Sequence, residues 1–106
     1  MKKFVWLSFD LGVQGDYEGL YEWLDKHEAK ECGESIACFW HESRGAVPDS
    51  ILKDLKSAVK LTGKTRVYVI WMADGKMKGR FIIGRRKSPP WTGYAAFEKE
   101  EVDSNE

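Results

Sequence analysis

The dipeptide Asp74-Gly75 lies between two runs of β-forming residues, "TRVYVIWMA" before it and "KMKGRFIIG" after it. An Asp-Gly pair flanked by alternating apolar residues predicts a two-residue hairpin turn, because both residues tolerate the positive φ angles that this turn needs. We therefore expect an antiparallel hairpin over about residues 66–84. The turn would set four cross-strand pairs: Ala73 with Lys76, Trp71 with Lys78, Val69 with Arg80, and Val67 with Ile82.

This register divides the hairpin side chains between two faces, because successive residues of a strand point to opposite sides. One face is almost wholly apolar, and we expect helices to cover it; it consists of Tyr68, Ile70, Met72, Met77, Gly79, Phe81 and Ile83. The other face mixes cations with apolar residues, and we expect it to be open to solvent. It consists of Val67, Val69, Trp71, Lys76, Lys78 and Arg80.

Hydrophobic periodicity indicates four further elements before the hairpin. These are a strand at 3–11, a helix at 17–30, a strand at 34–42 and a helix at 50–61. Asp16 is expected to cap the first helix, and Gly63 to follow the end of the second. The expected core consists of Val5, Leu7, Phe9, Leu20, Leu24, Leu55, Val59, Tyr68, Ile70, Met72 and Phe81.

The order strand, helix, strand, helix, strand, strand predicts an α/β (α+β) two-layer sandwich of the ferredoxin-like type or a variant of it. Its four-stranded sheet would carry both helices on one face. A doubly wound three-layer sheet is the alternative, because the first strand is apolar on both faces. Residues 1–97 are expected to form one domain, in which 91–97 would add a short edge strand or pack back as coil. Residues 98–106 are expected to form an acidic disordered tail.

The composition of this 106-residue chain indicates its cellular compartment and how its charge is distributed. No apolar run approaches the roughly 20 residues that span a bilayer, so no membrane contact is expected. Two cysteines in a chain long enough to build a core indicate free thiols and a cytoplasmic protein. The formal net charge is zero, yet residues 10–34 are strongly acidic and residues 75–97 contain cations and no acid.

Cations interleaved with aromatic residues on an open sheet are typical of single-stranded nucleic-acid binding, because bases stack on rings while Lys and Arg contact phosphates. The expected phosphate contacts are Lys76, Lys78, Arg80, Arg85, Arg86 and Lys87, and the expected stacking residues are Trp71 and Trp91. No catalytic motif accompanies them. A small non-catalytic nucleic-acid-associated protein is therefore predicted.

A protein-interaction module is the alternative from another class. If Trp6, Val69 and Trp71 share the open face, a monomer would expose a large apolar patch. Such patches usually mark contacts with a partner. This interpretation predicts a homodimer or another protein partner at these three residues.

Metal-ligating residue types occur in the spacing H-x4-C-x5-C-x2-H, formed by His27, Cys32, Cys38 and His41. Zinc sites normally contain tight C-x2-C or H-x3-H pairs, and neither is present. His27 also falls on the apolar stripe of the first expected helix. The sequence therefore predicts no metal site and no cofactor.

The strand "FVWLSFD", which ends at Asp10, resembles the first strand of the small ferredoxin-like CRISPR-associated endoribonucleases and of ferredoxin-like antitoxin ribonucleases. In the CRISPR-associated family, the aspartate at this strand end helps to hold a metal at a dimer interface. The resemblance implies a metal-dependent endoribonuclease in which each subunit of a dimer contributes Asp10. It makes Asp10 the candidate catalytic residue of this chain.

Overall fold

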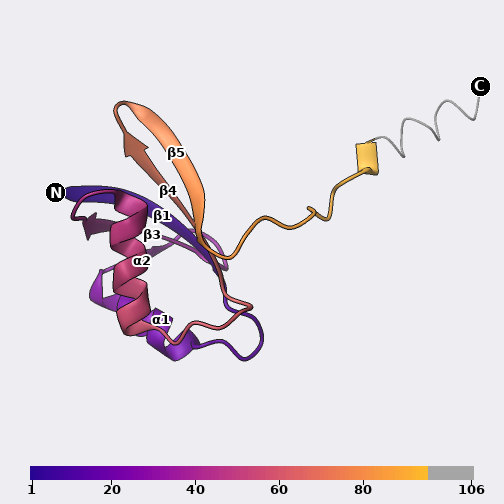
Figure 1. Ribbon diagram of the computed structural model, residues 1–106, viewed down its shortest axis with the longest axis horizontal. Helices are drawn as coiled ribbons and strands as arrows, with labels where there is room; N and C mark the ends of the chain where they lie inside the picture. Colours follow the sequence, from indigo (N-terminus) through magenta and orange to yellow (C-terminus); the bar gives the residue numbers. More distant parts are fainter. Residues whose placement is uncertain (96–106) are drawn as a thin grey trace, which may run out of the picture.

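The computed structural model describes residues 1–95 and contains a five-stranded sheet with two helices packed on one face (Figure 1). The elements in chain order are β1 (Lys2–Asp10), α1 (Tyr17–Lys26), β2 (Lys30–Glu31), β3 (Ile36–Glu42), α2 (Val47–Ala58), β4 (Arg66–Ala73) and β5 (Lys76–Ile83). The strands lie in the order β2-β3-β1-β4-β5, and all neighbours are antiparallel. In this part of the chain, neither helix has the length and apolar character that crossing a bilayer requires.

The prediction of a four-stranded sheet is wrong, because β2 adds a fifth strand. The expected first helix does not reach Lys30: it ends at Lys26, and Glu28 has a φ of 54° that breaks the helical path. Lys30 and Glu31 then pair with Cys38 and Ala37 of β3. A two-residue strand is too short to show alternation, so periodicity assigns these residues to the preceding helix. The doubly wound alternative is also wrong, because the strands are antiparallel.

Both helices begin where local chemistry favours a start. Asp16 caps α1 as expected, and its side chain accepts a hydrogen bond from the backbone N–H of Gly19. Helix α2 begins at Val47, with a proline in its first turn, where the missing N–H costs nothing. It ends at Ala58, so Gly63 is not its cap.

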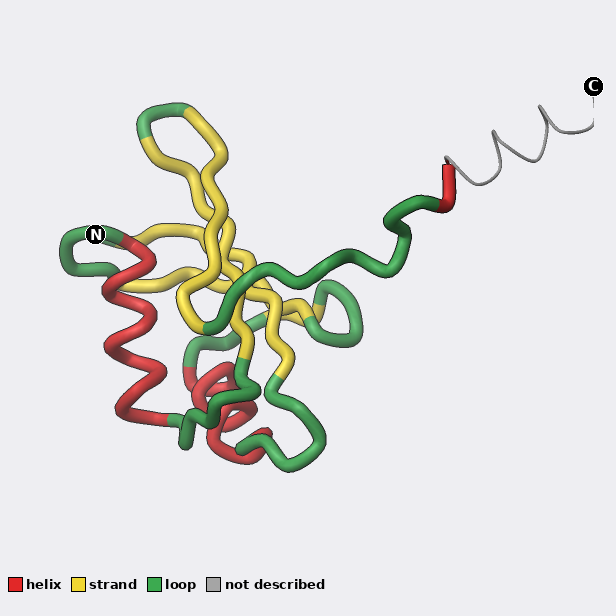
Figure 2. Tube along the Cα trace, turned by 45° about the vertical axis from the view of Figure 1, so that its right-hand side comes forward, coloured by secondary structure: helices red, strands yellow, loops and turns green. Residues whose placement is uncertain are grey.

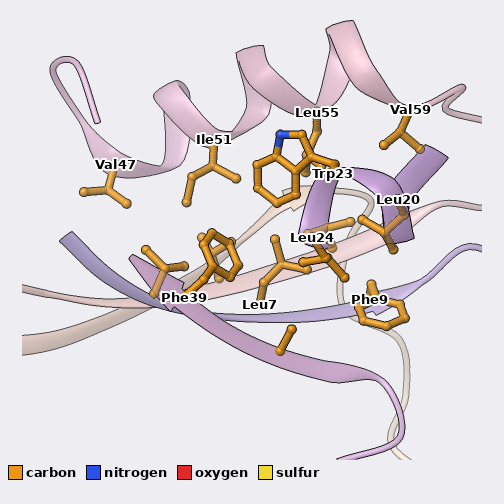
Figure 3. Close-up of a cluster of buried hydrophobic side chains, with 14 of the residues drawn as sticks. Leu7, Phe9, Leu20, Trp23, Leu24, Phe39, Val47, Ile51, Leu55 and Val59 are labelled. Atoms are coloured by element: carbon orange, nitrogen blue, oxygen red, sulfur yellow. The ribbon is translucent and has the colours of Figure 1, made fainter. Parts of the chain in front are cut away.

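The core lies between the helices and one face of the sheet (Figure 3). Val5, Leu7 and Phe9 of β1 are buried there, as predicted. The helices contribute buried side chains that Figure 3 shows facing the strands: Leu20, Trp23, Leu24, Ile51, Leu55 and Val59. Seven of the eleven expected core residues are therefore buried, and the exceptions all come from the hairpin.

The assignment of the two hairpin faces is wrong. Val69 is 0% exposed and Trp71 9% exposed beneath the helices, whereas Met72 is 46% exposed on the other side. Tyr68, Ile70 and Phe81 are only half-buried there. The reason is the pairing of β4 with β1, which puts Val69 opposite Leu7 and Trp71 opposite Val5. Directly paired residues share a face, so the buried face of β1 selects the buried face of β4.

The hairpin turn itself is confirmed at Asp74-Gly75, where both residues have positive φ angles. Three of the four expected pairs are also confirmed: Ala73 with Lys76, Trp71 with Lys78, and Val69 with Arg80. The fourth is wrong, because an irregularity between Val67 and Tyr68 pairs Val67 with Ile83. The tip of the hairpin projects beyond the helices (Figure 2).

Beyond β5, residues 84–95 leave the sheet and run away from the two packed layers (Figure 1). Residues 91–95 form turns and one short helical step, so the edge strand expected to begin there is not formed within them. Trp91 and Tyr94 are both largely exposed. The proposed domain end at residue 97 and the acidic tail at 98–106 lie outside the described residues.

Candidate nucleic-acid interface

The structure divides the predicted phosphate contacts into two groups, one on the helix side of the hairpin and one beyond the end of β5. Lys76, Lys78 and Arg80 lie on the helix side, since Lys78 is paired with the buried Trp71 and Arg80 with the buried Val69. The Arg80 guanidinium contacts Asp49 of α2 at 3.3 Å, and both side chains are largely exposed. An exposed ion pair of this kind contributes little stability.

Of the predicted cations beyond β5, Arg86 lies on the open face beside a pair of aromatic rings. The rings of Tyr68 and Phe81 meet edge to face, with centroids 4.9 Å apart. Two guanidinium groups lie over the Phe81 ring, that of Arg66 at 5.2 Å and that of Arg86 at 5.7 Å from its centroid. This arrangement places positive charge directly beside flat stacking surfaces.

Gly79 allows the Tyr68 ring to lie across β5. A Cβ atom at position 79 would stand 2.6 Å from the Tyr68 phenol oxygen. Real Cβ atoms essentially never approach another heavy atom so closely, so any larger residue would displace the ring. The glycine therefore leaves the space that the tyrosine ring occupies on the open face.

A basic groove follows at the end of the sheet, where β1 and β5 end and β4 begins. It has a volume of about 610 Å³, and its cationic lining consists of Lys64, Arg66, Arg85, Arg86 and Lys87. The Arg66 Nε–H donates to the backbone carbonyl of Arg85 at 3.2 Å, which ties the start of β4 to the chain beyond β5. A second hollow of about 290 Å³ shares Arg66 and Arg86 and reaches Tyr68 and Phe81.

Asp10 lines both hollows at the end of β1. Its exposed carboxylate accepts a hydrogen bond from the Gly12 N–H at 3.0 Å, and its backbone lies opposite Arg66. The carboxylate thus closes the turn after β1 and adds one negative charge to a basic surface.

Further aromatic rings continue across the open face. Phe4 meets both Trp6 and Trp40 edge to face, at 5.1 Å in each case. Trp40 on β3 is 58% exposed. Trp6, expected at an interface, is half-buried on this face, whereas Val69 and Trp71 lie beneath the helices.

Sequence reasoning therefore missed five residues of the open face and its groove: Trp40, Lys64, Arg66, Tyr68 and Phe81. Tyr68 and Phe81 were assigned to the core because their face of the hairpin is apolar. Had the face of β4 been taken from its pairing with β1, the alternation would have placed both residues correctly. Trp71 is buried, and Trp91 lies on the segment that leaves the sheet.

The residues considered as metal ligands form two separate clusters. Cys32 and Cys38 have their sulfur atoms 3.0 Å apart as free thiols, and the hydrogen bond between them raises the pKa of Cys38. His27 and His41 instead lie beside Asp54 of α2. His41 is hydrogen-bonded through Nε2 to Asp54 and through Nδ1 to Ser43, each at 2.7 Å. Ser43 is itself buried, so this Ser-His-Asp chain does not present an accessible nucleophile.

Comparison with known proteins assigns no relatives: protein-family models, curated proteins and solved structures all give no match to this chain.

Proposed function

We propose that this chain binds single-stranded nucleic acid on the open face of its sheet, at the end lined by the basic groove. One observation carries the proposal: two arginines, Arg66 and Arg86, lie over the ring of Phe81 beside Tyr68. Proteins recognise unpaired bases by stacking them on aromatic rings and guanidinium planes. The arrangement offers both surfaces in one place.

The charge around this position supports the proposal. Lys64, Arg85 and Lys87 line the groove that continues from Arg66 and Arg86, so phosphates that follow a stacked base meet further cations. Tyr68 and Phe81 provide the stacking rings beside this groove. A backbone-tracking basic groove combined with stacking rings is the common design of proteins that bind single strands without strong sequence preference.

The test is a titration of the protein against a short labelled oligouridine or oligothymidine, followed by fluorescence anisotropy at several salt concentrations. Binding through phosphates should weaken steeply with salt. The double variant Arg66→Gln/Arg86→Gln should bind more weakly, and its log–log salt slope should be smaller by about 0.7 for each lost phosphate contact. The matched control is Lys76→Gln/Lys78→Gln, which removes the same charge from the helix side of the hairpin and should change neither property.

Two results would overturn this proposal. One is an absence of binding at low salt. The other is an equal loss in both double variants, because that would indicate only a general attraction to positive charge. Cleavage of the oligonucleotide that requires a divalent metal and disappears in Asp10→Asn would instead favour a metal-dependent endoribonuclease.

A second candidate function is a protein-interaction module, here a homodimer. The observation that favours a homodimer is the apolar surface on the same face of the sheet, where Trp40, Met72 and Met77 are exposed. Trp40 lies on β3, away from the arginines over Phe81, so self-association and nucleic-acid binding are compatible. The free thiols of Cys32 and Cys38 fit a cytoplasmic setting for either function, because thiols stay reduced there.

A further inference from the structure

A cluster of metal-ligating groups lies on the opposite side of the sheet from the basic groove. His27 follows α1, His41 belongs to β3 and Asp54 belongs to α2. One ligand atom from each residue lies within 4.8 Å of the others. Thus three elements separated along the chain bring two imidazoles and a carboxylate together.

The hydrogen bond of His27 to a backbone carbonyl leaves its other ring nitrogen free to bind a metal. Its Nδ1 lies 2.8 Å from the backbone carbonyl of Trp23. A carbonyl can only accept, so Nδ1 carries the proton and Nε2 keeps its lone pair. Metal-binding histidines almost always donate their other ring N–H in this way, which fixes the tautomer and the ring orientation.

His41 can adopt the same state while its Nδ1 keeps a hydrogen bond. Its Nδ1 lies 2.7 Å from the Ser43 hydroxyl, which can donate or accept. Without a metal, the hydroxyl donates to Nδ1 and the Nε2–H donates to Asp54. With a metal, Nδ1–H donates to the hydroxyl and Nε2 becomes a ligand. Ser43 thus supports both tautomers of a side chain that is only 1% exposed.

We propose that this cluster binds one divalent transition-metal ion, zinc in the first place, through Nε2 of His27, Nε2 of His41 and a carboxylate oxygen of Asp54. Two imidazoles and one carboxylate are a common zinc donor set. His27 and His41 are too far apart in the sequence to form a short zinc-binding motif. The three ligands come from separate segments of the chain, the third from α2.

Binding requires a small rearrangement that the cluster can make. His41 Nε2 and Asp54 Oδ2 are 2.7 Å apart, whereas two tetrahedral ligands at zinc distances are separated by about 3.3 Å. The Asp54 side chain is 45% exposed and can move outward, which widens this separation. All three residues line a groove of about 550 Å³, so the fourth position of the metal faces solvent.

The experiment uses the full chain, metal-free and without a histidine tag. Zinc binding is measured by calorimetry, and cobalt is used as a spectroscopic substitute whose visible absorption reports the ligands. We expect one ion per chain and a rise in the thermal midpoint that saturates at one equivalent. His27→Gln and Asp54→Asn should each weaken zinc binding by at least about tenfold.

Two controls separate this site from the other groups that could hold zinc. Asp49→Asn removes an exposed carboxylate from the same helix and should leave the affinity unchanged. Cys32→Ser/Cys38→Ser removes the thiol pair and should also leave it unchanged, and the cobalt complex should show no thiolate charge-transfer band. Circular dichroism confirms that each variant is folded. Asp54→Asn is expected to fold, because its amide oxygen can still accept from His41.

Three outcomes would overturn the proposal. The first is no binding of zinc or cobalt at millimolar concentration. The second is binding that survives both His27→Gln and Asp54→Asn, and the third is binding that disappears with the cysteines. If either ligand variant unfolds, the wild-type cobalt spectrum and the cysteine double variant still decide between imidazole and thiolate ligands. None of these results bears on the oligonucleotide titration, which tests another face.

Discussion

At the scale of single residues, Asp16 shows how one carboxylate connects two helices. Asp16 is half-buried, and one of its oxygens accepts from the Gly19 N–H at 2.9 Å and so caps α1. The other accepts from the Lys60 N–H, also at 2.9 Å, just beyond the end of α2. These two backbone hydrogen bonds, that of Lys60 first, hold the pKa of Asp16 below its ordinary value of 3.8.

The lowered pKa predicts how stability depends on pH. Because the folded state favours the carboxylate, the stabilisation is complete above the unfolded-state pKa of about 3.9 and is lost as the pH falls through the lower folded-state pKa. Asp16→Asn should lower the free energy of unfolding at neutral pH and flatten its decline below about pH 4. Urea unfolding at several pH values measures this effect. Asp25→Asn, at an exposed carboxyl of the same helix, is the control, and an unchanged acid profile in Asp16→Asn would contradict the expectation.

Neighbouring residues determine the positions of two important side chains, those of Tyr68 and His41. The Tyr68 ring lies over Gly79 because Gly79 has no Cβ, and His41 is oriented by Ser43 and Asp54. Tyr68 and His41 would contact a ligand directly, but neighbouring residues determine their positions. The residue types of these neighbours do not reveal this role in the sequence. The proposed stacking surface and the proposed metal site both depend on such pairs.

At the scale of elements, the β4–β5 hairpin depends on its turn. Gly75 has a φ of 74°, a left-handed conformation that a side chain disfavours. Gly75→Ala should therefore lower the free energy of unfolding by about 1 kcal/mol, although a Cβ there would meet no atom within 4 Å. Chemical denaturation measures the change.

Gly63→Ala is the matched control for this substitution. A Cβ at position 63 also meets no atom within 4 Å, but its backbone is not left-handed. The control should be neutral or slightly stabilising, because alanine reduces the conformational entropy of the unfolded chain. If both variants lose the same stability, backbone strain is not the cause.

At the scale of the whole molecule, one face of the sheet is packed by helices and the other is open. The open face combines a basic end at Arg66 and Arg86 with an aromatic region at Phe4, Trp6 and Trp40. Large exposed apolar patches are uncommon on monomers. The basic end and the aromatic region occupy different parts of this face, so they can contact different partners.

This division predicts self-association through the aromatic region. Sedimentation velocity should show a dimer that forms at high micromolar concentration. Trp40→Glu should weaken the dimer, because it places a charge in the apolar patch, and should leave the oligonucleotide affinity nearly unchanged. A wild-type protein that stays monomeric over the whole range would rule out this contact, and Glu18→Gln on α1 serves as an unrelated surface control.

What the sequence by itself determines here is local. The Asp74-Gly75 turn, the cap at Asp16, the proline near the start of α2 and the inward face of β1 all follow from backbone preferences and alternation over a few residues. These preferences act within one element, so they can be read before the elements meet. Within the candidate interface, the sequence also located Arg85, Arg86 and Lys87 just beyond the end of the last strand, where the structure has them.

Only the tertiary structure decided which face of the hairpin is buried. Both faces of β4 are apolar, so alternation leaves two choices of similar free energy, and the pairing of Val69 with Leu7 selects one. The same holds for β2, which exists because β3 pairs with it, and for Asp54, which reaches His41 of β3 from helix α2. These outcomes depend on burial and hydrogen bonding between segments distant in the chain, which no local pattern encodes.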